Sequence, residues 1–169
     1  LISLDMLTGA VTYAREIGLR ASAVFEAESG QVQTDCAIAE ELAGAGFDEL
    51  LIRGFESYET LDNGSIETML SYVRSLRERA PMDIGVCLSG AVYTAAQYAP
   101  YIEKLFLETE FLAIDLTAAN AEDAAAAAQR LQGSFTAYLL RAVLDGSNPE
   151  NSAAVQAVLS EENIRSLLY

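Results

Sequence analysis

Charged and polar side chains stand near the ends of five short apolar segments, and they could do acid–base chemistry. Glu26 and Glu28 are two residues apart, so they project on one side if the first segment continues as a strand. The second to fifth segments carry, in turn, a base, a neutral residue, an acid and a base near their ends. These residues are Arg53, Ser89 (two places after Cys87), Asp115 and Arg141. Because a buried charge costs several kcal/mol unless it is paired, these residues need a polar site around them.

The sequence holds no histidine, and this restricts the chemistry. Ser-His-Asp and Cys-His nucleophile pairs are excluded, and so is histidine-ligated zinc. General acid–base work would therefore fall to Asp, Glu, Tyr, Cys or Lys104.

Two interpretations of the strand-end charges stay open. The acids and arginines could neutralise each other in a structural ion network, or at least two of them could serve catalysis or ligand binding. A third alternative is Mg²⁺ or Ca²⁺ held by Glu26, Glu28 and Asp115, although the sequence shows no Asp-rich ligand loop. Gly-rich phosphate motifs are missing as well, so we expect neither a metal nor a cofactor.

The composition limits the kinds of molecule that the protein could bind. The 169 residues carry 10 Lys and Arg against 25 Asp and Glu, which gives a net charge of −15 and argues against nucleic acid. Half of the residues are hydrophobic (51%), as in a chain with a real core, but no stretch is apolar for the roughly 20 residues of a membrane span. Cys36 and Cys87 are too few for a disulfide scaffold, and we expect two free thiols.

The elements that must position the charges form a repeat. The five segments with strand character start 29, 34, 28 and 25 residues apart, a spacing typical of βα units with parallel strands. The predicted strands are Arg20–Phe25, Glu49–Gly54, Asp83–Leu88, Phe111–Leu116 and Thr136–Val143.

Helix signals separate the strands. Ser3, Thr34, Ser65 and Asn120 are candidate N-caps, and Gly18 and Pro81 follow two of the helices. Apolar stripes predict two buried faces, Leu7, Val11, Ala14 and Ile17 in the first helix and Ile66, Met69, Leu70, Val73 and Leu76 in the third. The predicted helices are Leu4–Ile17, Asp35–Ala43, Ile66–Arg79, Gly90–Lys104, one that follows Asn120, and one or two within Asn151–Leu168.

We therefore predict one α/β domain over residues 1–169, with about five parallel strands in a TIM-barrel-like arrangement. A complete eight-stranded barrel typically takes about 250 residues, so the barrel would be incomplete or part of a longer one. A flavodoxin-like three-layer sandwich is the alternative. A barrel that lacks strands exposes sheet edges, so a homo-oligomer is plausible.

Several segments resemble a known family. Leu4–Phe25 resembles a helix-then-strand unit, and Ala43–Phe55 ("AGAGFDELLIRGF") resembles a "GFDE" strand of glycoside-hydrolase TIM-barrel domains of bacterial surface and secreted proteins. "MDIGVCLSG" and "FLAIDLTA" are similar to the next two strands of that pattern. The family has an Asp-Tyr-x-Arg-Phe stretch where this chain has Leu51–Phe55, so Phe55 remains, Arg53 lies one position before the Arg of the pattern, and the acid is absent. Glu56 is the nearest substitute.

The resemblance implies a glycoside-hydrolase-like, carbohydrate-active domain, and carboxylates could do that chemistry without histidine. We predict Glu26 and Asp115 as the catalytic pair. The alternative is a degenerate, non-catalytic barrel that binds or scaffolds. The ligand would be a carbohydrate or another small molecule, and the location would be extracellular or at the cell surface if the resemblance holds, otherwise cytoplasmic. The residues predicted to bind substrate are Glu28, Arg53, Glu56, Ser89 and Arg141.

Overall fold

A computed structural model describes residues 4–27, 31–54, 63–90, 92, 96–132, 140–161 and 165–168. The chain divides into two compact units, Leu1–Gly85 and Val86–Tyr169. The division falls inside strand β3 (Asp83–Ser89), so each unit holds part of that strand.

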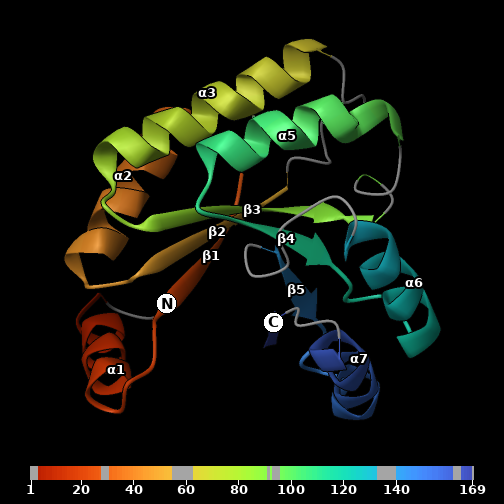
Figure 1. Ribbon diagram of the computed structural model, residues 1–169. Coiled ribbons are helices and arrows are strands. Elements are labelled where there is room, and N and C mark those ends of the chain that lie inside the picture. Colours follow the sequence, from red (N-terminus) through yellow and green to blue (C-terminus); the bar gives the residue numbers. More distant parts are fainter. Residues whose placement is uncertain are drawn as a thin grey trace. The chain divides into compact units, whose positions relative to one another are not determined.

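The first unit alternates helices and strands (Figure 1). Its strand order is β1-β2-β3, and β1 pairs with β2 in parallel from Ser22 opposite Glu49 to Glu26 opposite Arg53. Helices α2 and α3 lie side by side. The elements before β3 are α1 (Leu4–Glu16), β1 (Ser22–Glu26), α2 (Val32–Gly44), β2 (Glu49–Arg53) and α3 (Asn63–Arg79).

Helix α3 confirms its predicted buried stripe. All five residues of that stripe are at most 2% exposed, because every third or fourth residue of a helix returns to the same face. Strand β2 is buried from Glu49 to Ile52. Tyr72 of α3 donates a 2.7 Å hydrogen bond from its hydroxyl to the buried carboxylate of Asp35 on α2, which ties the two helices together.

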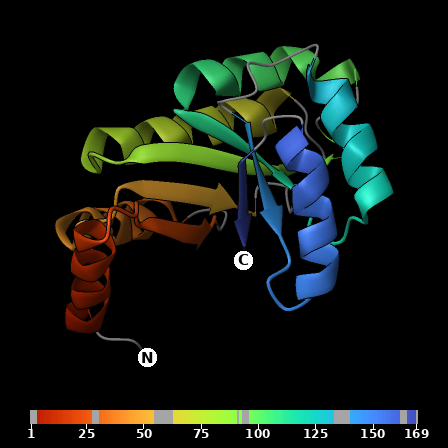
Figure 2. The same ribbon diagram turned by 60° about the horizontal axis from the view of Figure 1, so that its bottom comes forward.

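The second unit has the strand order β3-β4-β5-β6. Strands β4 and β5 pair in parallel, and so do β5 and β6. Helix α7 packs on β5 and β6, as Figure 2 shows. The elements after β3 are the short helix η2 (Ala96–Tyr98), α5 (Ala99–Glu108), β4 (Phe111–Asp115), α6 (Ala121–Gln132), β5 (Leu140–Leu144), α7 (Pro149–Glu161) and β6 (Arg165–Leu168).

The prediction of helix for the last segment was wrong at its end. Helix α7 stops at Glu161, and Arg165–Leu168 forms strand β6. Arg and Leu are good helix formers, so local propensity does not reveal this strand. Its assignment comes from pairing with β5, where Ala142 lies opposite Ser166.

Several predicted helix starts were also wrong. Helix α2 begins at Val32 and α3 at Asn63, so Thr34 and Ser65 lie inside helices and do not cap them. For the predicted helix Gly90–Lys104, Gly90 and Val92 are helical, and residues 91 and 93–95 lie outside the described residues. Helix α5 begins at Ala99, with Pro100 in its first turn, where the missing N–H of proline costs no hydrogen bond. Asn120 does cap α6, since its side-chain oxygen accepts the N–H of Asp123 at 2.9 Å.

The fold is α/β, with parallel strands and alternating helices in a TIM-barrel-like arrangement. In the flavodoxin-like alternative the first strand lies between the second and the third. Here β2 lies between β1 and β3, so that alternative is wrong. Cys36 and Cys87 are both free and both buried. Among the described residues, the helices are too short or too polar for a bilayer crossing.

Candidate functional site

Glu26 and Arg53 form the acid–base pair of the first unit. They end strands β1 and β2 and lie directly opposite each other in the parallel register. The Arg53 Nη1 and Glu26 Oε1 atoms are 3.8 Å apart, a loose ion pair. The Arg53 side chain is 18% exposed and that of Glu26 is 58% exposed, so the carboxylate is open to solvent.

Gly54 makes room for the Glu26 carboxylate. Its φ of +89° lies in the region that side chains other than glycine rarely adopt. A Cβ at this position would lie 2.9 Å from the Ala27 carbonyl oxygen and 3.2 Å from Glu26 Oε2. Any larger residue would therefore push against the chain that positions Glu26.

Asp115 ends β4 in the second unit and is held by its own loop. Its Oδ1 atom accepts the Thr117 N–H at 3.0 Å and the Thr117 hydroxyl at 2.6 Å. The next residue, Leu116, donates its N–H to the Val143 carbonyl of β5. The carboxylate is half-buried and fixed at the carboxyl end of the strand.

Asp145 repeats this arrangement one strand later, and it was not predicted as a site residue. Its Oδ1 atom accepts the Ser147 N–H at 2.8 Å and the Ser147 hydroxyl at 2.6 Å. These two bonds hold the pKa of Asp145 below its ordinary value, the hydroxyl bond more than the backbone one. The sequence signal was available as Asp-x-Thr and Asp-x-Ser after successive strands.

Arg141 lies elsewhere than predicted. Strand β5 is described from Leu140 to Leu144, and the part of the predicted strand before Leu140 lies outside the described residues. Arg141 is therefore three residues before the end of the strand and not near that end. It lies opposite Ala113, whereas Asp115 lies opposite Val143. Its guanidinium carbon is 3.8 Å from the centre of the Phe111 ring, a cation–π contact. The predicted ring of charges at one level therefore fails at Arg141.

The remaining predicted residues divide into two groups. Ser89 is the last residue of β3, and its hydroxyl oxygen lies 3.4 Å from the backbone N–H of Val92. Glu28 and Glu56 lie outside the described residues. The structure thus brings Glu26 together with Arg53 in the first unit, and Asp115 with Thr117 in the second.

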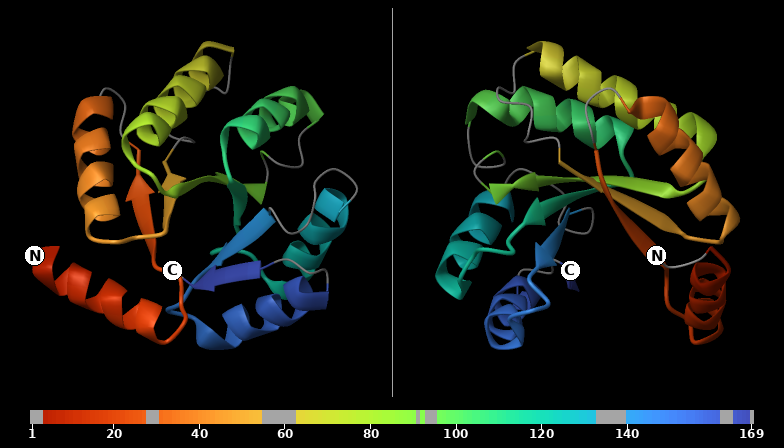
Figure 3. Two further views of the ribbon diagram at one scale, coloured as in Figure 1. Left: turned by 60° about the vertical axis from the view of Figure 1, so that its left-hand side comes forward. Right: turned by 180° about the vertical axis from the view of Figure 1, so that it is seen from behind.

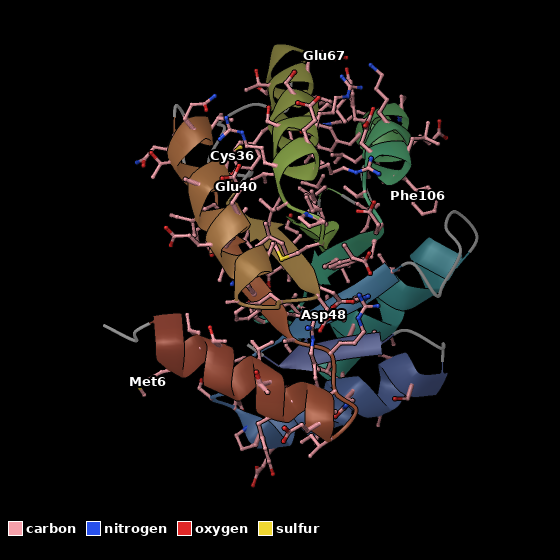
Figure 4. All side chains as sticks on the ribbon, turned by 90° about the vertical axis from the view of Figure 1, so that its left-hand side faces the viewer. Met6, Cys36, Glu40, Asp48, Glu67 and Phe106 are labelled. Carbon is pink, nitrogen blue, oxygen red and sulfur yellow. The ribbon has the colours of Figure 1, made fainter. Side chains whose placement is uncertain are left out.

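A denser charge network lies at the amino ends of β1, β2 and β3. Arg15 pairs with Asp48 at 2.9 Å, and Arg20 pairs with Asp83 and with the buried Glu49. Asp48, labelled in Figure 4, also accepts the Ala21 N–H. That backbone bond and then Arg15 lower the pKa of Asp48. In TIM barrels this end of the strands serves stability, so we assign the network no chemistry.

Metal chemistry has no support in the described part of the chain. No group of three or more Cys, Asp or Glu side chains there is arranged to hold an ion. The alternative with Glu26, Glu28 and Asp115 includes a residue that is not described. Burial raises the pKa of the Cys36 thiol above its ordinary value.

Comparison with known proteins identifies the fold. No family model matches the sequence, and no curated protein matches it. Among solved structures, the chain is similar to the HMG-CoA lyase of Brucella melitensis, with a TM-score of 0.62 and 16% identity. It is also similar to the pyruvate carboxylase of Rhizobium etli (0.69, 12%) and to a GH113 β-1,4-mannanase (0.66, 8%).

These structures are longer than the chain. The alignments cover 98%, 98% and 99% of this chain but 60%, 17% and 68% of the lyase, the carboxylase and the mannanase. The similar structures are TIM-barrel enzymes, and at these identities the likeness concerns the fold alone. The TIM-barrel-like α/β class predicted from the strand spacing is thereby confirmed.

Proposed function

We propose that the chain is a carbohydrate-active domain of the glycoside-hydrolase kind, with Glu26 and Asp115 as its catalytic carboxylates. The observation that carries the proposal is their position, since each ends a parallel strand at its carboxyl end. In TIM-barrel enzymes the active site is built at that end of the strands. A mannanase among the similar structures is an example of a glycoside hydrolase with this type of fold.

Hydrolysis of a glycosidic bond needs two carboxyl groups with different roles. One protonates the leaving oxygen, and the other attacks the sugar or activates water. Thr117 fixes the rotamer of Asp115, and Arg53 orients Glu26 or a substrate hydroxyl. Ser89, Glu28 and Glu56 remain the proposed substrate-binding residues with Arg53. Arg141 is the weakest member of that group, because it already stacks on Phe111.

Turnover of a panel of oligosaccharides, measured as released reducing sugar, tests the proposal. Glu26→Gln and Asp115→Asn keep the size of each side chain, and Asn can still accept both bonds from Thr117. We expect each variant to lose at least about a hundredfold in kcat with an unchanged fold. Asp145→Asn is the matched control, since it alters the same turn on the next strand and should keep full activity. Unchanged turnover in both site variants would remove the catalytic pair.

A non-catalytic sugar-binding domain is the second candidate. It is favoured by the loose pairing of Glu26 with Arg53, which already neutralises that acid. Calorimetric titration with the same oligosaccharides separates the two functions. Binding without turnover, weakened by Arg53→Met but not by Asp115→Asn, would support the binding domain.

A further inference from the structure

Asn151 on helix α7 connects the loop after β4 with the start of the helix that follows β5. Its side-chain amide donates a hydrogen bond from Nδ2 to the Ala119 carbonyl at 2.9 Å, and the two residues are 32 positions apart in sequence. Ala119 lies in the loop between Asp115, the last residue of β4, and helix α6. Both partners of the bond belong to the second unit, so the contact is internal to that unit.

The loop after β4 contains one short turn that also orients Asp115. The Ala119 N–H donates to the Leu116 carbonyl at 3.0 Å, which closes a turn over residues 116–119. Thr117 lies inside this turn and gives Asp115 Oδ1 its two hydrogen bonds, at 3.0 and 2.6 Å. The carbonyl that Asn151 binds and the donors that orient the carboxylate therefore belong to the same turn, and a shift of Ala119 moves Thr117 with it.

The first turn of α7 holds Asn151 by hydrogen bonds to the loop after β5. The Asn151 N–H donates to Asn148 Oδ1 at 3.3 Å, and the Ser152 N–H donates to the Asn148 carbonyl at 3.0 Å. Ser152 is 3% exposed, and its hydroxyl donates to the Asp145 carbonyl. The Asn151 side chain therefore extends from a base that is fixed at both Asn148 and Asp145.

The turn over residues 116–119 is attached at both of its ends. At its start, the Leu116 N–H donates to the Val143 carbonyl of β5 at 3.0 Å. At its end, Asn151 attaches Ala119 to α7, and helices α6 and α7 lie side by side (teal and blue in Figure 3). A turn attached only at Leu116 could pivot about that point, whereas the second attachment fixes its orientation.

We propose that Asn151 is a positioning residue for Asp115, because it fixes the far end of the turn whose Thr117 donors orient the carboxylate. The inference deepens the proposed function and rests on it for the effect on turnover. A reacting group that is misplaced by about 1 Å can cost about a hundredfold in rate. Loss of the Asn151 bond leaves the Leu116 attachment and the Thr117 bonds in place, so the cost should be smaller than that.

Turnover of the Asn151→Asp variant of the 169-residue chain tests the proposal. The substitution keeps the size of the side chain but replaces the amide donor with a second oxygen acceptor, so the bond to the Ala119 carbonyl is lost. An acid in the first turn of a helix is favourable, so α7 itself should stay stable. We expect kcat to fall about tenfold, with KM changed by less than about twofold, because Asn151 is not among the proposed substrate-binding residues.

The control for this variant is Gln156→Ala, which changes an exposed residue of the same helix and should keep full activity. An unchanged kcat of Asn151→Asp in an active protein would overturn the proposal.

The Asp115→Asn background separates positioning from a general loss of structure. If Asn151 acts through Asp115, Asn151→Asp should lower the remaining turnover by less than about twofold once the Asp115 carboxylate is absent. A merely structural role would lower turnover by the same factor in both backgrounds, and that result would refute the positioning role.

Amide hydrogen exchange distinguishes failure of this inference from failure of the proposed function. In Asn151→Ala and Asn151→Asp, the Thr117 amide should exchange at least about fivefold faster, because its turn is released at Ala119. The Ser147 amide makes the same kind of bond to Asp145 at 2.8 Å in the next loop, so it is the control and should not change. Unchanged exchange at Thr117 would overturn the inference even in an active protein. If the wild-type protein turned over no oligosaccharide, the proposed function would fail, and the Thr117 exchange would still decide whether Asn151 holds the turn.

Discussion

The two units hold the acids at their strands in different ways. In the first unit the carboxylates of Glu26, Asp48 and Asp83 pair with arginines. In the second unit Asp115 and Asp145 accept hydrogen bonds from Thr117 and Ser147 of their own loops. Acids of the first unit therefore have arginine partners in addition to donors such as the Ala21 N–H, whereas Asp115 and Asp145 have hydroxyl and N–H donors from their own loops.

This difference shows which contacts depend on the tertiary structure and which form locally. Arg15 and Asp48 are 33 residues apart in sequence, and Arg20 and Asp83 are 63 apart, so these pairs form only when the strands come together. Asp115 and Thr117 are two residues apart and meet wherever the turn forms. We expect the first unit to respond to salt and to charge removal more strongly than the second.

Substitution of the glycines that follow β2 and β3 should give the largest difference in stability loss between the two units. Gly54→Ala puts a Cβ 2.9 Å from the Ala27 carbonyl at a φ of +89° and should destabilise the first unit by about 2–3 kcal/mol. Gly90→Ala in the second unit meets only the Ile114 Cδ1 atom at 3.7 Å and should change stability by less than about 0.5 kcal/mol. Native-state hydrogen exchange of β2 and β4 amides measures each unit separately, and equal losses would contradict the contrast.

Removal of the Asp48 carboxylate comes next. Asp48→Ala deletes the acceptor for the Ala21 N–H and for Arg15, so we expect the first unit to lose about 1–2 kcal/mol. Asp48→Asn keeps an oxygen acceptor and should lose less. Urea unfolding followed by exchange at β1 and β2 gives the values. If the loss of stability were confined to the second unit, the charge network around Asp48 would not stabilise the first unit.

Added salt should lower the stability of the first unit more than that of the second, by less than the substitutions above. The arginines of the first unit's pairs at Asp48 and Asp83 are more than half exposed, so about 1 M NaCl should weaken those pairs. We expect the opening free energy of β1 to fall by about 0.5 kcal/mol relative to that of β5. The Asp48→Asn variant is the control, since its relative shift with salt should shrink.

Acid pH should give the smallest effect. The lowered pKa of Asp48 means that its contribution to stability is fully present above the ordinary Asp value of about 3.9. That contribution is lost as the pH falls through the lower pKa of the folded protein. The pKa of Asp145 shifts in the same direction, but its donors come from its own turn, two residues away, so we expect a weaker effect on stability. Exchange at β1 between pH 5 and 2.5, with and without Asp48→Asn, measures the difference.

Local patterns predicted most of the repeat. The apolar runs located β1 to β4 to within two residues of their starts, and the stripe of α3 was buried as expected. Glu26 and Asp115 could be found because strand ends are visible in sequence. Strand β6 and the place of Arg141 could not, because both depend on the register with β4 and β5.

The sequence by itself determined a histidine-free α/β repeat with acids at strand ends. It also fixed the Asp-x-Thr and Asp-x-Ser turns, since those bonds span two residues. Only the tertiary structure decided that Glu26 meets Arg53 and that Arg141 meets Phe111. The physical reason is that these contacts join segments far apart in the chain, and their partners are chosen by strand order and register.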